Sequence, residues 1–271
     1  MTQTTTSADG TTIAYDVVGS GPSLVNVDGA LCRRDFGPAK ELAEALSDRF
    51  TVYTYDRRGR GGSDIAKPAA AGTTEAVEQE VADLAAVIEA AGGHAYVLGQ
   101  SSGAALALEG ARAGLPIDKV VAFEAPFVLD DSRRPDDADL AQQAEELVKK
   151  GKRAAAVELF LRAVGVPLIG VKLMRLTPAF RKLAAVAHTL PYDLGLVVPF
   201  RQGQPLPGGY FKNVSVPVLS VAGGKSPDYM TNAQQAIAKA VPDGRYVVLD
   251  GQDHMVQASA LAPMAPEFFG S

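Results

Sequence analysis

Residues 95–113 constrain the fold of this chain more than any other segment. An apolar, strand-like run at residues 95–98 leads into Gly99-Gln100-Ser101-Ser102-Gly103, and a helical pattern continues to residue 113. Glycines two positions before and after Ser101 leave room for a sharp, strained turn at which longer side chains would collide. The segment therefore predicts a strand that turns abruptly into a helix, as at the carboxyl edge of a parallel sheet.

The same order of strand and helix repeats along the chain. With 271 residues, 47% of them hydrophobic, the protein can bury one sizeable core. Apolar runs rich in β-branched residues alternate with helical patterns, which predicts an α/β fold: a mostly parallel, doubly wound sheet with helices on both faces. Residues 11–18 and 23–27 are joined by a glycine-rich turn and indicate an antiparallel start. Further strands are expected at residues 51–55, 95–98, 119–123, 216–221 and 245–249, and helices at 38–46, 75–91, 103–113 and 233–240.

One long gap carries no strand pattern. Between residues 127 and 212 there are short helical patterns at residues 138–150, 154–164, 171–176 and 180–189, separated by glycine or proline. A helical insertion between two core strands lies at one end of the sheet and can act as a lid. We therefore expect a core of residues 1–127 and 212–271, with a helical cap at 128–211. The apolar residues available to line a hydrophobic pocket there, or to pack on the core, are Leu159, Phe160, Leu168, Ile169, Leu173, Met174 and Leu190.

Charge and composition argue against several classes of function. The 26 basic and 31 acidic residues give a net charge of −5, and the basic residues form no stripe that would attract a nucleic acid. The chain has no apolar stretch long enough to span a membrane and no signal-peptide pattern, so we expect a cytoplasmic protein. The single cysteine, Cys32, excludes an internal disulfide, and three histidines make a structural zinc site improbable. Asp64 stands where a dinucleotide-binding G-x-G-x-x-G would need its third glycine, so we expect no cofactor. The oligomeric state cannot be inferred.

Three further segments support an interpretation of the Ser101 turn as a nucleophile elbow, G-x-S-x-G. They are residues 56–64 (DRRGRGGSD), residues 27–30 (VDGA) and residues 251–254 (GQDH). Together with the elbow they resemble the α/β-hydrolase fold family, and the resemblance extends over nearly the whole chain. It implies a serine hydrolase with a helical cap and a Ser-His-acid catalytic triad.

The resemblance also assigns roles to Ser101 and His254. Family members place the nucleophile first, the acid next and the histidine last along the chain. Only His254 lies after Ser101 in a loop near the C-terminus, so Ser101 is the candidate nucleophile and His254 the candidate general base. His94 precedes the elbow, and we expect it at the surface. His188 falls in the helical insertion, where it either packs against neighbours or lines the pocket.

The acid of the triad is the point at which this sequence departs from the family pattern. In most members it follows the strand expected here at residues 216–221, but Ser226 stands in that position. A serine cannot carry the negative charge that stabilises an imidazolium. The substitutes are Glu124, which closes an apolar strand at the sheet's carboxyl edge, and Asp228. We favour Glu124, because a charged residue at that edge needs a buried partner.

The expected reaction is the cleavage of an ester, a lactone or a related acyl compound through an acyl-enzyme. The backbone N–H groups of Ala30 and Ser102 are expected to form the oxyanion hole. Asp28 replaces the histidine of the family's oxyanion loop; it would disfavour anionic substrates if it points into the pocket, and is otherwise a turn residue. A small or medium hydrophobic substrate is expected. Other activities remain open, namely acyl transfer or a lyase reaction at the same site, or non-catalytic ligand binding.

Overall fold

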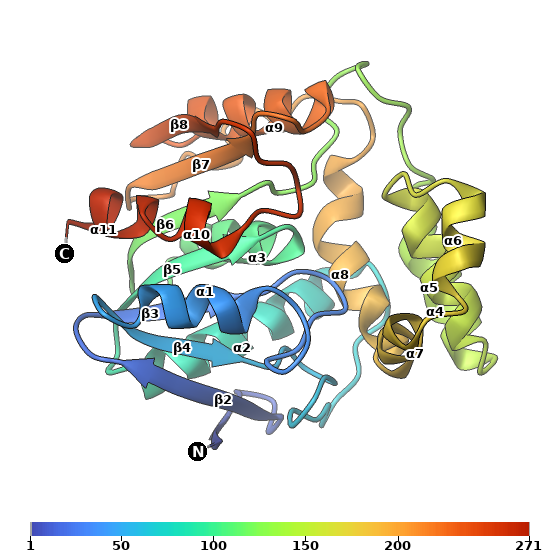
Figure 1. Ribbon diagram of the computed structural model, residues 1–271, viewed down its shortest axis with the longest axis horizontal. Coiled ribbons are helices and arrows are strands. Elements are labelled where there is room, and N and C mark those ends of the chain that lie inside the picture. Colours follow the sequence, from blue (N-terminus) through green and yellow to red (C-terminus); the bar gives the residue numbers. More distant parts are fainter. Residues whose placement is uncertain (1, 271) are drawn as a thin grey trace.

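An eight-stranded sheet forms the centre of the protein in a computed structural model that describes residues 2–270 (Figure 1). The strand order is β1-β2-β4-β3-β5-β6-β7-β8; β1 pairs antiparallel with β2 and β2 with β4, and the remaining pairs are parallel. The predicted mostly parallel sheet with an antiparallel start is therefore confirmed. The strands are β1 (Gln3–Thr6), β2 (Thr12–Gly19), β3 (Ser23–Val27), β4 (Thr51–Tyr55), β5 (Ala95–Gln100), β6 (Ile117–Phe123), β7 (Val218–Gly223) and β8 (Gly244–Leu249).

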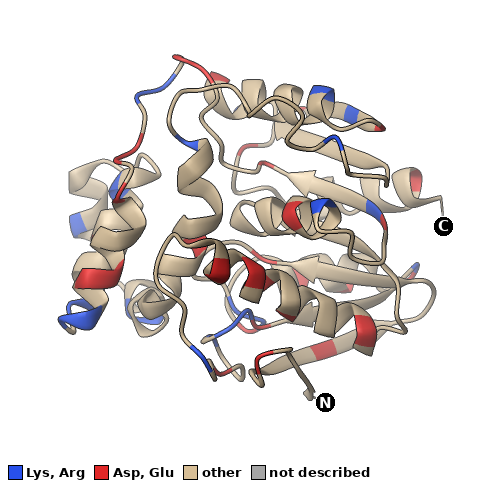
Figure 2. Ribbon diagram, turned by 180° about the vertical axis from the view of Figure 1, so that it is seen from behind, with Lys and Arg blue, Asp and Glu red and all other residues tan. Residues whose placement is uncertain are grey.

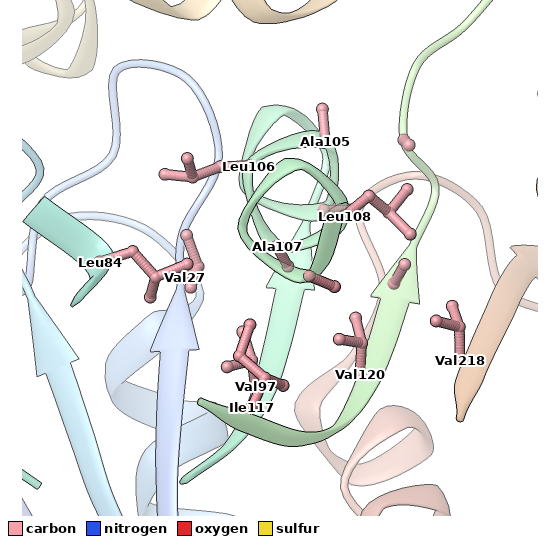
Figure 3. Close-up of a cluster of buried hydrophobic side chains, with 14 of the residues drawn as sticks. Val27, Leu84, Val97, Ala105, Leu106, Ala107, Leu108, Ile117, Val120 and Val218 are labelled. Atoms are coloured by element: carbon pink, nitrogen blue, oxygen red, sulfur yellow. The ribbon is translucent and has the colours of Figure 1, made fainter. Parts of the chain in front are cut away.

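Helices cover both faces of the sheet, as predicted. The helices α2 (Thr74–Ala90), α3 (Ser102–Arg112) and α9 (Asp228–Ala240) pack on one face, and α1 (Ala39–Leu46), α10 (Ala258–Leu261) and α11 (Met264–Phe269) on the other. Because both faces are covered, the central strands are apolar along most of their length. Figure 3 shows side chains of α3 packed against those of the central strands, among them Leu106, Leu108, Val97, Val120 and Val218.

Between β6 and β7 the chain forms only helices among its regular elements. They are α4 (Leu140–Lys149), α5 (Arg153–Ala163), α6 (Leu168–Met174), α7 (Pro178–Ala185), the 3₁₀ turn η1 (Ala187–Thr189), α8 (Leu190–Val197) and the 3₁₀ turn η2 (Val198–Phe200). We call these elements the helical segment. It lies beyond the carboxyl ends of the parallel strands, with α8 nearest the sheet and α4 to α7 farther out (Figure 1). Its inner side chains form a hydrophobic cluster of their own, which includes Leu140, Val157, Leu161, Phe180 and Leu194.

Three elements differ from the sequence-based expectations. Helix α8 was not expected because Pro191 was interpreted as a separator, but proline in the first turn of a helix loses no hydrogen bond. Strand β1 was missed because its short Thr-rich sequence has no apolar alternation. Helix α9 begins at Asp228, before the apolar pattern starts at Ala233.

Among residues 2–270, no single helix is both long enough and apolar enough to cross a bilayer. One bent pair of helices, Pro178–Ala185 with Ala187–Phe200, is long and apolar enough only when its two parts are taken together, and these parts are bent by 45° relative to each other. The helix α8 in that pair is buried along its whole length.

Candidate active site

Ser101 occupies a sharp turn between β5 and α3. Its backbone has φ 56° and ψ −124°, and its N–H donates to the carbonyl of Phe123 on the neighbouring strand at 2.9 Å. A Cβ atom on Gly99 would lie 2.4 Å from the carbonyl oxygen of Gly103, and one on Gly103 would lie 2.2 Å from that of Val27. Both positions therefore require glycine because the backbone passes so close, which is the reason the G-x-S-x-G spacing forms this turn.

The structure brings Ser101, His254 and Glu124 together. His254 Nε2 lies 3.1 Å from Ser101 Oγ, and His254 Nδ1 lies 2.7 Å from Glu124 Oε2. The other carboxylate oxygen of Glu124 accepts a hydrogen bond from Gly223 N–H at 2.7 Å. The Glu124 side chain is fully buried, whereas that of His254 is 38% exposed. Both carboxylate oxygens thus have a donor, and the imidazole ring connects a buried charge to an accessible hydroxyl.

The alternative acid, Asp228, lies elsewhere. It is the first residue of α9, it is exposed, and in the described part of the chain it makes no hydrogen bond with His254. Ser226, at the family's usual acid position, has a buried hydroxyl without a partner among residues 2–270. The carboxylate beside the histidine therefore comes from the end of β6 rather than from the loop after β7.

Backbone strain is concentrated around Ser101. Leu31, Ser101 and Glu124 are the three non-glycine residues with positive φ among residues 2–270, at 61°, 56° and 50°. They follow β3, β5 and β6, which are neighbours in the sheet. Each such conformation costs about 1 to 3 kcal/mol and persists where surrounding contacts over-determine it. The concentration of strained residues at adjacent strand ends is typical of a functional site.

The loop after β3 lies directly against Ser101. A Cβ atom on Gly29 would lie 3.1 Å from Ser101 Cβ, and Ala30 and Ser102 line the same cavity as Ser101. Neither Ala30 N–H nor Ser102 N–H has an acceptor within residues 2–270. Ser102 also begins α3, so its N–H belongs to the positive end of the helix dipole. Two free donors therefore flank the Ser101 hydroxyl.

Asp28 lies directly after β3, is buried, and also borders the cavity. Its Oδ1 accepts from Gly29 N–H at 2.9 Å, and its Oδ2 lies close to Cys32 and Gly37 without a hydrogen-bond partner in the described residues. Burial raises the pKa of Asp28 to about 6, although the Gly29 N–H and the nearby Arg60 oppose the rise. The carboxylate thus carries a desolvation cost that its contacts offset only in part.

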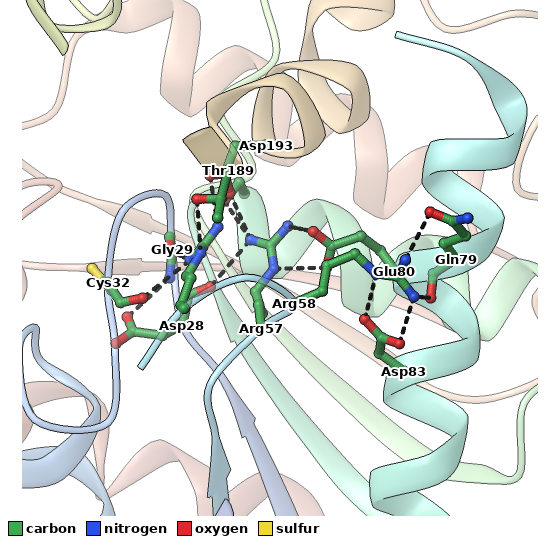
Figure 4. Close-up of polar contacts among 12 residues, drawn as sticks. Asp28, Gly29, Cys32, Arg57, Arg58, Gln79, Glu80, Asp83, Thr189 and Asp193 are labelled. Atoms are coloured by element: carbon green, nitrogen blue, oxygen red, sulfur yellow. Dashed lines mark hydrogen bonds and ion pairs between the residues drawn. The ribbon is translucent and has the colours of Figure 1, made fainter. Parts of the chain in front are cut away.

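Next to Ser101 lies a buried ionic network of Arg57, Arg60, Glu80, Ser102 and Asp193. Figure 4 labels Arg57, Glu80 and Asp193 of this network together with neighbouring contacts. Arg57 Nη1 donates to Asp193 Oδ1 at 2.8 Å and to Ser102 Oγ at 2.9 Å, and the Ser102 hydroxyl donates to Asp193 Oδ1 at 2.9 Å. Arg60 donates to Asp193 Oδ2 at 2.6 Å and to the Gly29 carbonyl at 2.8 Å. The remaining nitrogens of Arg57 bind Glu80. The network ties α8 to both the turn at Ser101 and the loop after β3.

Asp193 stays ionised in this network. Burial alone would raise its pKa, but the contacts with Arg60 and Arg57 outweigh burial and hold the pKa below its usual value. No role was expected for Asp193 from the sequence. A signal was available, since Asp193 is the one charged residue in the apolar run of residues 190–200, LPYDLGLVVPF. A lone carboxylate in a buried helix needs a buried cation.

A cavity of about 510 Å³ opens above Ser101 and is lined largely by apolar side chains. The helical segment contributes Phe160, Leu161, Met174, Leu194 and Val197. Arg201 also lines the cavity but is already paired, because it binds Asp136 at 2.5 Å and donates to the carbonyls of Pro126 and Ala163.

Six residues considered for the pocket lie outside it, and two of them, Leu159 and Leu190, pack in the hydrophobic cluster of the helical segment. His188 is half-buried in η1 and does not line the cavity, so its candidate role in substrate binding has no support from its position. Leu168, Ile169 and Leu173 were expected to face inward, but they are 55%, 74% and 62% exposed. Helix α6 packs through Val171 instead, which leaves these three side chains on its outer side.

Comparison with known proteins agrees with this architecture. Residues 17–267 match the family described as Alpha/beta hydrolase family. An alpha/beta hydrolase from Sphaerobacter thermophilus is 44% identical, with a TM-score of 0.88 over 98% of this chain and 100% of that one. An uncharacterised hydrolase of Bacillus subtilis is 30% identical over 158 residues, which span 58% of this chain and 56% of that protein. An enol-lactonase from Burkholderia xenovorans shares the fold, with a TM-score of 0.71 at 16% identity over 99% of this chain and 100% of that one. The chain belongs to the alpha/beta hydrolase family.

Proposed function

We propose that the protein is a serine hydrolase that cleaves an ester, a lactone or a related acyl compound through an acyl-enzyme. The observation that carries the proposal is the continuous line of hydrogen-bonding distances from Ser101 Oγ through the His254 ring to Glu124, at 3.1 and 2.7 Å. A nucleophile, a base and a group that orients the base are the minimum set for this chemistry. Ser101 and His254 line a cavity with room for a small substrate, and Glu124 lies buried behind His254.

In the proposed mechanism, Ser101 Oγ attacks the substrate carbonyl carbon while His254 Nε2 takes the hydroxyl proton. Glu124 holds the Nδ1 proton and stabilises the imidazolium that forms. The imidazolium then gives its proton to the leaving oxygen, the bond to the leaving group breaks, and an ester to Ser101 remains. Water, deprotonated by His254, attacks this ester and releases the acid and the free serine.

The negative charge that develops on the carbonyl oxygen would be stabilised by the backbone N–H groups of Ala30 and Ser102. Their lack of an acceptor in the described residues supports this role. One such donor is typically worth about 3 kcal/mol in the transition state. Because backbone groups provide the hydrogen bonds, the replacement of the family's usual histidine by Asp28 leaves the oxyanion hole complete.

The helical segment would act as a cap, and the substrate would be a neutral, hydrophobic acyl compound. Support comes from the apolar residues that α5, α6 and α8 contribute to the cavity. The cations near the cavity are already paired: Arg201 with Asp136, and Arg57 and Arg60 with Asp193. A substrate carboxylate would meet no free cation there, and it would approach the Asp28 carboxylate instead.

Labelling with a fluorophosphonate probe tests the proposal, because covalent labelling requires an activated serine. Wild-type protein should be labelled, and Ser101→Ala should show neither labelling nor hydrolysis of p-nitrophenyl esters while remaining folded. Ser226→Ala is the matched control, since its hydroxyl has no partner in the described chain, and it should retain both activities. An unlabelled wild type would favour non-catalytic ligand binding. Labelling without ester hydrolysis would favour acyl transfer or a lyase reaction.

A further inference from the structure

Residues 164–176, which include α6, carry most of the exposed large apolar side chains in the described part of the protein. Nine such side chains are exposed among residues 2–270, and five of them lie within residues 164–176. Ile169 and Leu173 are one helical turn apart on α6, and Leu176 follows just beyond the helix and is 83% exposed. This spacing forms a single ridge opposite the buried Val171. We call the following residues the α6 patch: Val164, Leu168, Ile169, Leu173 and Leu176.

The surroundings of the α6 patch are basic, although the protein as a whole is acidic. Residues 151–192 contain seven basic residues and one acidic residue, whereas the whole chain contains 26 and 31. All seven basic residues are exposed, and the single acidic residue, Glu158, pairs with Arg175 at 2.5 Å. Figure 2 shows Lys and Arg on the outer helices and most of the acidic residues on the rest of the molecule. The basic residues are Lys152, Arg153, Arg162, Lys172, Arg175, Arg181 and Lys182.

The α6 patch is continuous with the active-site cavity. Val164 belongs to the patch and also lines the cavity, and Met174 on the inner side of α6 lines it as well. Met255, next to His254, is 81% exposed and also lines the cavity. The rim of the cavity is therefore apolar on both the α6 side and the His254 side.

We propose that the α6 patch and its basic rim dock the protein on an anionic lipid surface. An apolar ridge beside exposed Lys and Arg residues is the composition with which helices bind in the plane of a membrane interface. The Leu and Ile side chains would move from water into the acyl region of the lipid, while the anionic headgroups would pair with the basic residues. The rim of the cavity would then face the lipid, so an apolar substrate would reach Ser101 without crossing water. This last consequence rests on the proposed function, but the docking does not.

Charge favours this partner over the alternatives. Symmetric pairing of two copies through the α6 patch would bring their seven-residue basic rims together, and the charges would repel each other. A nucleic acid would neutralise the cations but leave the apolar ridge in water. An anionic lipid surface satisfies both features.

Sedimentation of the purified full chain with lipid vesicles tests the proposal. The protein should bind vesicles of phosphatidylcholine mixed with phosphatidylglycerol, should bind pure phosphatidylcholine much less, and should be released by high salt. Leu173→Ser and Lys172→Glu should each weaken binding to the mixed vesicles about tenfold or more. Leu173→Ser removes apolar surface that the lipid would bury, and Lys172→Glu reverses a charge that the anionic headgroups would attract. The matched controls are Val18→Ser on β2 and Lys239→Glu in the last turn of α9, both exposed and at the edge of the sheet opposite the helical segment; they should bind like wild type.

The failure of this proposal can be distinguished from the failure of the proposed function. Ser101→Ala should bind vesicles like wild type, because docking needs no catalysis. The proposal is wrong if wild type fails to sediment with the mixed vesicles, or if the α6 variants and the controls bind alike. It is also wrong if the protein proves to be a dimer that Leu173→Ser converts to a monomer, since the patch would then be an interface between copies.

Discussion

Replacing Glu124 by glutamine would reverse the hydrogen bonding on which the proposed base depends. Gly223 N–H donates to Glu124 Oε1 at 2.7 Å, so a glutamine oxygen has to stay there and its NH₂ group has to face His254 Nδ1. His254 can then accept a hydrogen bond at Nδ1 only as the tautomer that carries its proton on Nε2. That proton would point at Ser101 Oγ, 3.1 Å away, and His254 could not take the serine proton. The imidazolium would also lose its counter-charge.

We expect Glu124→Gln to lower kcat by a factor on the order of a thousand to ten thousand, or about 4 to 5 kcal/mol of transition-state stabilisation. KM should change little, because Glu124 is buried behind the histidine and does not line the cavity. The assay is the hydrolysis of p-nitrophenyl esters, with circular dichroism to show that the fold is retained. Asp228→Asn is the control and should remain close to wild type, since Asp228 is exposed at the start of α9. A folded Glu124→Gln variant within tenfold of wild type would refute the reasoning.

Three further predictions concern stability. Gly103→Ala would place a Cβ atom 2.2 Å from the Val27 carbonyl oxygen, so it should destabilise the protein by at least about 3 kcal/mol in urea unfolding, whereas Gly208→Ala, in open space, should not. Asp193→Asn would leave two buried arginines undercompensated and should cost about 3 to 5 kcal/mol in the same assay; an unchanged unfolding midpoint would contradict the role given to the network. Burial raises the pKa of Asp28 to about 6, so at this group the native state binds more protons than the unfolded state between about pH 4 and 6, and the contribution of Asp28 to stability falls as the pH rises through that range. Asparagine does not titrate, so the unfolding free energy of Asp28→Asn relative to wild type should increase by about 3 kcal/mol from about pH 4 to 7, and a constant difference would refute the assignment.

The parts of the fold that the sequence predicted are those in which local pattern and tertiary environment agree. Strands β5 and β7 are buried on both faces, so their apolar runs are visible in the sequence as well as in the structure. Helix α8 is different, since it is buried on all sides and has a proline in its first turn, and neither feature gives an amphipathic helical period in the sequence. For helix α6 the helical pattern was recognised, but the expected buried face was wrong. Its apolar residues suggested a buried face, but which face is buried depends on Val171 packing into the helical segment, a long-range contact that no local pattern encodes.

The site was predictable where chemistry depends on short motifs. The turn at Ser101 requires glycine at positions 99 and 103, and both positions lie within the five-residue motif, so the local sequence predicts the turn. The pairing of Glu124 with His254 joins residues 130 positions apart, so it could be proposed only from the end of a strand and from the loss of an acid at Ser226. The buried ionic network could not be predicted in this way, because its members come from separate elements that meet only in the folded chain.

The buried ionic network also limits which part of a cap over this site could open. Moving α8 away from the sheet would separate Asp193 from Arg57 and Arg60, and breaking a buried pair on one side costs about 3 to 5 kcal/mol. It would also release the Ser102 hydroxyl and loosen the Gly29 carbonyl, the two points that hold the proposed oxyanion donors. Within residues 2–270 the outer helices make no ion pair with the elbow, since α5 and α6 meet the rest of the segment mainly through apolar packing, with hydrogen bonds from Arg133 and Arg201 to the Ala163 carbonyl at the end of α5. Opening should therefore occur between α8 and the outer helices, at the side where α6 carries its exposed apolar ridge. In energetic terms α8 belongs with the sheet and the proposed active site, and we expect the movable part of the proposed cap to be confined to the helices that precede it.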